Sequence, residues 1–237
     1  NAINQVDFGG ACIPEEPTIV LDHIRIIHPG VGLTCQASDL ELLACANADC
    51  SNLYPDPVDL TLQPAGWLPA QNVTLTGAAN LQFQRSAEET VTLGVSNASP
   101  APDNGTVCIA SDGSGSCVME FRDAGFFFDL PDTRSGVEDT FTMVALEKDS
   151  QSGQCVAMFE EQDLEVGFSS SYLVPGPLDR TDEYPVYIKG TAINNDGTGW
   201  TPVDISFNEN GVAEVPFRYD DTGQMGLSAT YEAPGQP

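Results

Sequence analysis

Apolar and polar residues alternate along much of the chain, in short runs rich in valine, isoleucine, threonine and phenylalanine. The clearest runs are VDLTL (58–62), NVTLTG (72–77), TVTLGV (90–95), TFTMVAL (140–146) and YPVYIKG (184–190). A period of two over such lengths is typical of half-buried β-strands. The runs are separated by turn-forming dipeptides such as Asn104-Gly105, Asp112-Gly113, Asp196-Gly197 and Asn210-Gly211. The pattern therefore predicts an all-β chain, folded as a sandwich or a barrel.

One segment fits two structures. Ser38 and Glu41 have the spacing of a capping box just ahead of LLACANA, which predicts a short helix. A strand that continues through LELLACA (40–46) is the competing interpretation. The sequence leaves both open.

An internal repeat indicates that the chain holds two similar units. Residues 91–130 have a weak but ordered counterpart in residues 186–227: a strand, an Asn/Asp-Gly loop, a strand, a turn, a strand ending Phe-Arg, an Asp-containing turn and a last apolar strand. The predicted fold class is all-β, with two tandem immunoglobulin-like β-sandwich modules that are disulfide-bonded. The expected ranges are 17–132 for the first module, 133–232 for the second, and 1–16 and 233–237 for termini or linker.

The chain has seven cysteines, which suit either a metal site or disulfide bridges. Zinc is the weaker interpretation because there is no Cys-x-x-Cys pair. The only histidines, His23 and His28, lie five residues apart in an apolar stretch, where a strand would point them to opposite faces. Both histidines are therefore expected to be structural, and no metal ligand or cofactor is assigned.

Bridges are the favoured interpretation of the cysteines. A hairpin over CIASDGSGSC would bring Cys108 opposite Cys117, and CANADC offers a second local closure from Cys45 to Cys50. Cys35 and Cys155 could then pair at long range. Cys12 would be left unpaired or bonded to a part of the protein upstream. Other pairings stay open, because six cysteines allow many connectivities. Bridges of any connectivity indicate an oxidising compartment.

The charge balance excludes some classes of partner. With 8 Lys and Arg against 35 Asp and Glu, the formal net charge is −27 at pH 7, which repels a phosphate backbone and an anionic membrane surface. No nucleic acid partner is expected. No segment reaches the roughly 18 consecutive apolar residues of a membrane-spanning helix, so no membrane insertion by this segment is expected.

No catalytic device stands out in the sequence. Both histidines lie in one opening strand, no Gly-x-Ser-x-Gly motif accompanies them, and the carboxylates are too numerous for any pair to be singled out. The chain is therefore predicted not to be an enzyme. Sugar binding needs an exposed aromatic side chain, and Trp67 and Trp200, in the turn-rich contexts PAGWLP and GTGWTP, are the candidate ligand-binding residues. Calcium binding at acidic turns stays open, although a solvated acidic surface is the simpler explanation.

The motifs GLTCQASDLELLACANADCSNLY, ETVTLGVSNASP, CVMEFRDAGFFF and NGVAEVPFRYDDTGQMGLSATY together resemble a known domain family. It is the domain of unknown function at the C-terminal end of MshQ-like proteins, which are encoded with the mannose-sensitive haemagglutinin pilus, a bacterial type IV pilus. The resemblance runs from about Ile24 to Tyr231, and its motifs are turns, strands and cysteines. It implies an exported protein, extracellular or on the bacterial cell surface and reached through the periplasm, and it implies no catalytic residues.

The resulting functional hypothesis is a non-enzymatic extracellular segment of a pilus-associated surface protein that acts as a structural stalk or an adhesion module. Its expected partners are other domains of the same longer chain, together with pilus components or surface glycans. The alternative is a carbohydrate-binding module of a secreted enzyme or lectin. Strand addition to an exposed sheet edge is a further option that the sequence does not locate.

Overall fold

The computed structural model describes residues 19–174, 184–195 and 199–232, and every regular element within them is a β-strand. Those of the first half are β1 (His23–His28), β2 (Val31–Leu33), β3 (Ser38–Cys45), β4 (Val58–Gln63), β5 (Trp67–Leu68), β6 (Asn72–Leu75), β7 (Ala78–Phe83), β8 (Glu89–Thr92), β9 (Gly94–Ser99), β10 (Thr106–Ala110) and β11 (Val118–Arg122). Those of the second half are β12 (Ala124–Asp129), β13 (Asp139–Lys148), β14 (Cys155–Ala157), β15 (Gln162–Val174), β16 (Val186–Ile188), β17 (Thr191–Ala192), β18 (Thr201–Phe207), β19 (Val212–Tyr219) and β20 (Gln224–Thr230). In these residues, no helix has the length and apolar character needed to cross a membrane.

The first module is a sandwich around one core. One layer is the five-stranded sheet β10-β1-β3-β7-β5, and the other is made of the three-stranded sheets β2-β11-β8 and β6-β4-β9, which meet where β8 leads into β9. The alternating apolar side chains of all three sheets form a single buried cluster, which includes Ile26, Leu42, Leu62, Phe83 and Phe121. The period-two pattern thus becomes one face per strand turned inward.

The segment with two predicted structures is strand β3. It pairs with β1 on one side and β7 on the other. Leu40, Leu42 and Ala44 are buried at alternate positions, so the strand places three apolar side chains in the core. A helix over the same residues would break two ladders of backbone hydrogen bonds, which is why the capping-box pattern does not decide the structure here.

The second module is a sandwich of two sheets. One sheet has the order β12-β13-β19-β16-β17, with β14 also paired to β13, and the other has the order β18-β15-β20. Its core is rich in aromatic rings: Phe141 packs edge-on against Phe128 and Phe217, with ring centroids 5.7 and 5.6 Å apart. The predicted fold class, two tandem disulfide-bonded β-sandwich modules, is confirmed.

Strand β12 is where the two halves of the sequence repeat differ. The counterpart of β12 in the repeat is β20, which lies within the second module. By analogy, the repeat predicts that β12 lies within the first module. Every residue from Ala124 to Asp129 pairs with β13 instead, so this strand belongs to the sheet of the second module. The boundary after residue 132 stays a prediction from the sequence. From this pairing we propose that the boundary lies at Asp123.

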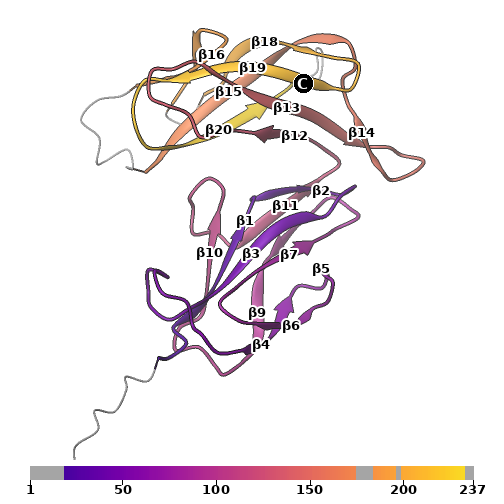
Figure 1. Ribbon diagram of the computed structural model, residues 1–237. Coiled ribbons are helices and arrows are strands. Elements are labelled where there is room, and N and C mark those ends of the chain that lie inside the picture. Colours follow the sequence, from indigo (N-terminus) through magenta and orange to yellow (C-terminus); the bar gives the residue numbers. More distant parts are fainter. Residues whose placement is uncertain (1–18, 175–183, 196–198, 233–237) are drawn as a thin grey trace, which may run out of the picture.

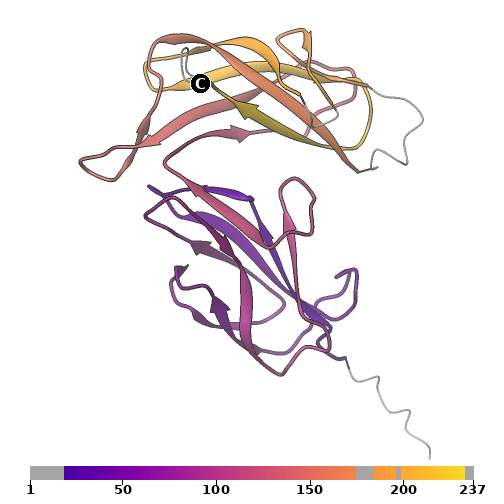
Figure 2. The ribbon, with the colours of Figure 1, turned by 180° about the vertical axis from the view of Figure 1, so that it is seen from behind.

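Figures 1 and 2 show the two modules stacked, with the strands of the second module running roughly across those of the first. Strand β12 lies on the side of the second module that faces the first, and the end of the first module that carries β2 and β11 faces it. Residues in the space between the modules can therefore fix the orientation of one module relative to the other.

Candidate functional site

A disulfide joins the two modules at this junction. Cys35 follows β2 in the first module, Cys155 opens β14 in the second, and the two cysteines are bonded with their Cα atoms 5.1 Å apart. The bond closes a loop with a sequence separation of 120 residues. Since the chain also passes from β11 to β12 through Asp123 alone, the modules are connected covalently at two points.

Asp123 is surrounded by hydrogen bonds from both sides of the junction. Its amide donates to Glu88 Oε1 at 3.1 Å, and its carbonyl oxygen accepts from the amide of Lys148 at 2.7 Å. Its carboxylate accepts from the hydroxyl of Thr34, which is itself buried. The residue that links the modules is therefore held in both of them, and is not a free hinge.

Lys148 adds a third connection. Its Nζ donates to the carbonyl oxygen of Ser86 in the first module at 2.6 Å and lies 3.7 Å from Asp123 Oδ1. The side chain leaves the end of β13 in the second module, so it crosses the junction. Sequence reasoning missed Asp123 and Lys148, because hydrogen bonds between residues far apart in the chain leave no periodic signal.

Close packing completes the junction. The tip of the β10–β11 turn lies against β15: a Cβ placed on Gly113 would sit 3.1 Å from Leu173 Cδ2. Gly113 has φ +78, a conformation that favours glycine, so this contact requires both its small size and its backbone freedom. At the other side of the junction, a Cβ on Gly125 would lie 3.4 Å from Leu33 Cδ2.

Two more disulfides lie within the first module. Cys45 is bonded to Cys50 and Cys108 to Cys117, with sequence separations of 5 and 9 residues. Together with the bond across the junction, these are the pairs that the sequence spacing suggested. Cys12 lies outside the described residues.

Acidic side chains order the turns beside these disulfides. In the β13–β14 turn, Asp149 Oδ1 accepts from the amide and the hydroxyl of Ser152 at 2.6 and 2.7 Å, which lowers the pKa of the Asp149 carboxyl. In the β10–β11 turn, hydrogen bonds from Ser114 lower the pKa of Asp112 in the same way. Both turns reach the junction, one through Cys155 and the other through Gly113.

These two carboxylates make the stability of the folded state depend on pH, in a direction that follows from their lowered pKa values. Their pKa values lie below the ordinary 3.8 when folded, so they stabilise the folded state above pH 3.8 and lose that contribution as the pH falls below it. We expect Asp149→Asn to lower the melting temperature at pH 7 and to converge with the parent below pH 3.8. The shift is expected to be small, because the carboxylate is exposed.

Thermal unfolding at several pH values measures this shift. The control is Asp56→Asn, a change at an exposed carboxylate outside these turns. A difference in melting temperature between Asp149→Asn and the parent that does not vary with pH would contradict the prediction.

The structure separates the two tryptophans that the sequence proposed for ligand binding. Trp67 is only 3% exposed and packs against Phe83 with ring centroids 5.2 Å apart, so its ring has no face open to a sugar. Strand β5 pairs with β7, which turns this side chain into the core. Trp67 is therefore no longer a candidate ligand-binding residue. Trp200 is 52% exposed, and its role in ligand binding stays a prediction.

Two shallow clefts lie on the sheet surfaces of the first module. One of about 430 Å³ is lined by Asp39, Leu68, Pro69, Asn80, Leu81 and Gln82. The other, of about 260 Å³, is lined by Asp59, Leu60, Thr61, Asn72, Val73, Thr74 and Asn97. Neither contains a tryptophan. In the second cleft, Asp59 accepts a hydrogen bond from Thr74 and Asn72 accepts one from Thr61, so four of its polar side chains are already paired across strands.

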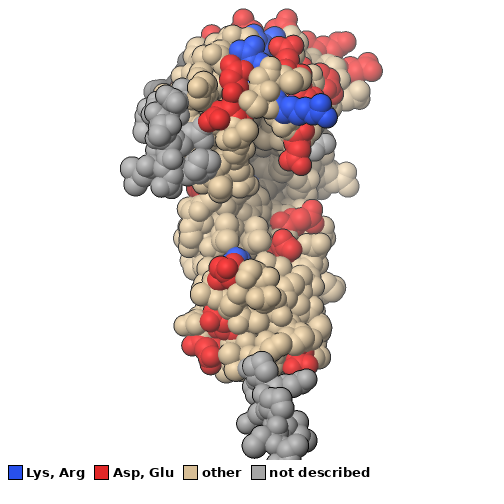
Figure 3. All heavy atoms as spheres, turned by 60° about the vertical axis from the view of Figure 1, so that its left-hand side comes forward, with Lys and Arg blue, Asp and Glu red and all other residues tan. Residues whose placement is uncertain are grey.

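The acidic surplus covers both modules. Figure 3 shows Asp and Glu side chains spread over the visible face, with the few Lys and Arg side chains mostly on the second module. In one acidic turn, Asp220 is paired with the guanidinium of Arg218 through bonds of 2.7 and 3.2 Å, and Asp196 of another lies outside the described residues. The expected absence of a nucleic acid partner stays a prediction from this charge.

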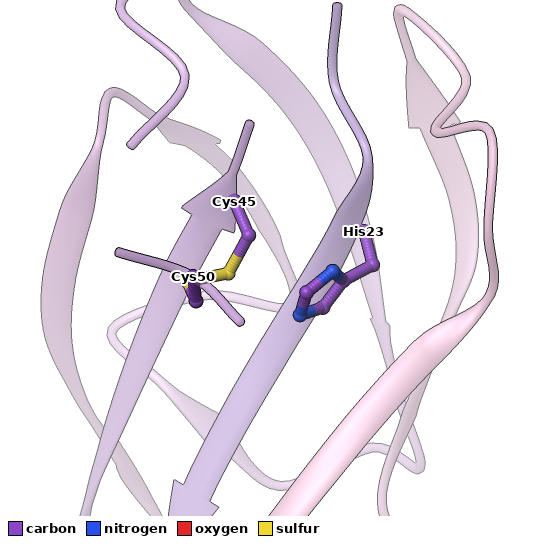
Figure 4. Close-up of side chains that lie close together, drawn as sticks. All are labelled: His23, Cys45 and Cys50. Carbon is purple, nitrogen blue, oxygen red and sulfur yellow. A yellow bond between two sulfur atoms is a disulfide. The ribbon is translucent and has the colours of Figure 1, made fainter. Parts of the chain in front are cut away.

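Both histidines are buried in β1. His28 bonds through Nε2 to the carbonyl oxygen of Ser116 at 2.8 Å and accepts from the amide of Gly30 at 3.1 Å through Nδ1. His23 lies beside the Cys45–Cys50 bond, with its imidazole facing the two sulfur atoms (Figure 4). Among the described residues, this is the one group of three or more potential metal-ligating side chains close enough to share an ion.

Two family models match the chain. Residues 105–237 match the model described as "Domain of unknown function (DUF6701), first Ig-like domain", and residues 21–101 match another domain of unknown function, DUF8613. The first match begins at residue 105, so it covers β10 and β11 of the first module as well as the whole described second module. Its description agrees with the immunoglobulin-like fold predicted from the sequence.

A search of curated proteins found no match. Among solved structures, the chain is similar to the structure titled "D0-D1 domain of Intimin", with 11% sequence identity and a TM-score of 0.35 over 86% of this chain and 88% of the other.

Proposed function

The chain belongs to the DUF6701 family, and from this premise we propose that it is a non-enzymatic segment of an exported surface protein, which acts as a structural stalk. The observation that carries the proposal is the junction between the modules. Two modules that move independently need only a linker between them. This junction has in addition a disulfide, a hydrogen-bonded linking residue and a lysine that crosses between the modules. Such a junction holds one module at a fixed angle to the next.

The proposed compartment follows from the same bonds. Three disulfides in one chain are stable in oxidising surroundings, which favours the extracellular space or the bacterial cell surface, reached through the periplasm. The resemblance to MshQ-like proteins supports a place in a surface protein that is associated with a type IV pilus. In that setting the partners would be other domains of the same longer chain and pilus components.

An adhesion role is the second part of the proposal. The exposed ring of Trp200 offers a face for a surface glycan, and this also keeps the carbohydrate-binding module as the alternative function. The stalk is favoured because the junction is built from several interacting residues, whereas Trp200 is a single exposed side chain.

A test of the stalk compares the parent chain with Cys35→Ser/Cys155→Ser. We expect residual dipolar couplings from both modules of the parent chain to fit one alignment tensor, because the junction fixes their orientation. In the variant, the couplings should require two different tensors. Cys108→Ser/Cys117→Ser is the matched control, since it removes a disulfide within one module and should leave a single tensor.

One outcome would refute the proposal, and another would change which contacts carry it. If the parent itself requires two tensors, the modules move independently and the stalk is wrong. If the variant still fits one tensor, Asp123 and Lys148 hold the modules without the disulfide, and the stalk would stand on hydrogen bonds alone.

A further inference from the structure

His23 has a buried nitrogen that the fold leaves unsatisfied. The side chain is 2% exposed, and its Nε2 has no hydrogen-bond partner among the described residues. A buried polar atom without a partner destabilises the folded state, so Nε2 is an unused ligand atom in the core of the first module. The sulfur atoms of Cys45 and Cys50 lie within 4.8 Å of a ring nitrogen of His23, and a disulfide donates no hydrogen bond.

The other ring nitrogen of His23 fixes the direction of the free one. Nδ1 lies 2.7 Å from Asp22 Oδ1, and the second carboxylate oxygen accepts from Asn104 Nδ2 at 3.2 Å. A carboxylate at Nδ1 favours the tautomer with its proton there, which leaves a lone pair on Nε2. Metal-binding histidines are commonly oriented by a carboxylate in this way.

The distances suit a single zinc ion once the sulfur atoms are separated. The ligand atoms of His23, Cys45 and Cys50 all lie within 4.8 Å of one another. Zinc holds thiolate sulfur at about 2.3 Å and imidazole nitrogen at about 2.0 Å, so tetrahedral ligands lie roughly 3.5–3.8 Å apart. Small rotations of the two cysteine side chains bridge the difference.

The loop that carries Cys50 does not depend on the disulfide for its position. The guanidinium of Arg25 on β1 donates to the carbonyl oxygens of Asp49 and Ala48 at 3.1 and 3.3 Å. Within the loop, the amide of Cys50 donates to the carbonyl oxygen of Asn47 at 3.0 Å. These bonds keep the second sulfur beside His23 after reduction, so the ligands are organised in advance.

We propose that, when the Cys45–Cys50 bond is reduced, His23 Nε2 and the two thiolates bind one Zn²⁺. A dithiol reductant supplies two electrons and two protons, which yields two thiols and the oxidised cyclic disulfide of the reductant. Zinc then displaces the two thiol protons and takes two sulfur ligands and one nitrogen, with a fourth position left for water. Reduction and metal binding thus exchange one cross-link for another at the same place. This inference does not rest on the stalk function.

The test uses the Cys12→Ser chain reduced with a dithiol and titrated with Zn²⁺ against a chromophoric chelator. We expect one zinc per chain, release of two protons, and protection of Cys45 and Cys50 from alkylation as mapped by mass spectrometry. Co²⁺ in place of zinc should give thiolate charge-transfer absorption. Asp22→Asn, which removes the orienting charge, should weaken zinc binding by about 10- to 100-fold.

His23→Gln and His28→Gln form the matched pair, since both histidines are buried on β1 and only His23 faces the sulfur atoms. His23→Gln should weaken zinc binding by at least about tenfold, and His28→Gln should leave it unchanged. Equal effects of the two changes, or protection of Cys108 and Cys117 in place of Cys45 and Cys50, would overturn the proposal.

A second variant covers the case in which full reduction unfolds the chain, which the emission of buried Trp67 would report. Cys50→His in the Cys12→Ser chain exchanges one thiol for an imidazole, so the site can form with the other two disulfides oxidised and no reductant present. Binding of zinc that is lost on adding His23→Gln supports the site. Absence of binding by this folded variant refutes it.

Discussion

Pulled by its two ends, the oxidised chain should extend by about 370 Å less than the Cys35→Ser/Cys155→Ser variant. The disulfide places residues 36–154 in a closed loop of 120 residues' separation, so force passes from Cys35 to Cys155 through the sulfur atoms and does not stretch the loop. The two local disulfides keep spans of 5 and 9 residues closed in both proteins. At roughly 3.5 Å per released residue, the remainder gives the expected difference.

Single-molecule stretching measures this difference directly as contour length. The matched control is Cys108→Ser/Cys117→Ser, measured in the parent and again with Cys35 and Cys155 replaced. Its 9-residue span lies inside the large loop, so opening it should add no length while the junction bond is intact and about 30 Å once that bond is gone. Equal contour lengths for the parent and the junction variant would show that the bond does not carry the load.

The load path has a consequence for the order of unfolding. With the junction bond intact, only β1 and β2 before Cys35, and the strands after Cys155, can be drawn out. Strands β3 to β13 stay within the closed loop, and these include most of the first module. A surface stalk with this connectivity would extend under tension only through β1, β2 and the strands after Cys155, because the junction bond shields the strands inside the loop from the load.

The strands were predictable because their signal is local. VDLTL became β4 with Val58, Leu60 and Leu62 buried, since alternation of side chains is a property of a few neighbouring residues. The two local disulfides were suggested by short spacings for the same reason. The capping box at Ser38 shows the limit of a local signal, because pairing with β1 and β7 outweighed it.

The junction was not predictable because it depends on contacts between distant residues. Nothing in the run FRDAG distinguishes Asp123, whose importance comes from Glu88, Thr34 and Lys148 lying around it in space. The burial of Trp67 has a similar origin: its turn-rich context suggested exposure, but its strand pairs with β7 and turns the ring toward Phe83. Side-chain direction in a two-residue strand is set by its partner, not by its neighbours in sequence.

Phe83→Ala should lower the free energy of unfolding of the first module by about 3–5 kcal/mol. The ring is fully buried between Trp67 and Phe121, at centroid distances of 5.2 and 5.7 Å, so its removal leaves a cavity between the two layers of the sandwich. Denaturant unfolding followed by the emission of Trp67, in a Trp200→Phe chain, reports on this module. A loss below about 1 kcal/mol would mean that the core closes around the gap or that the ring is not packed as described.

The matched change in the second module is Phe141→Ala, which removes an equally buried ring from between Phe128 and Phe217. If the modules unfold separately, this change should leave the Trp67 transition where it is and shift the β-sheet signal of the second module in circular dichroism. If the junction couples them, each change should move both transitions. Adding Cys35→Ser/Cys155→Ser should then abolish the cross-effect, because the disulfide, the Asp123 hydrogen bonds and Lys148 act together only while the modules are held in place. A cross-effect that survives the loss of the disulfide would assign the coupling to Asp123 and Lys148, and a stalk built on them would stiffen without depending on the redox state of its surroundings.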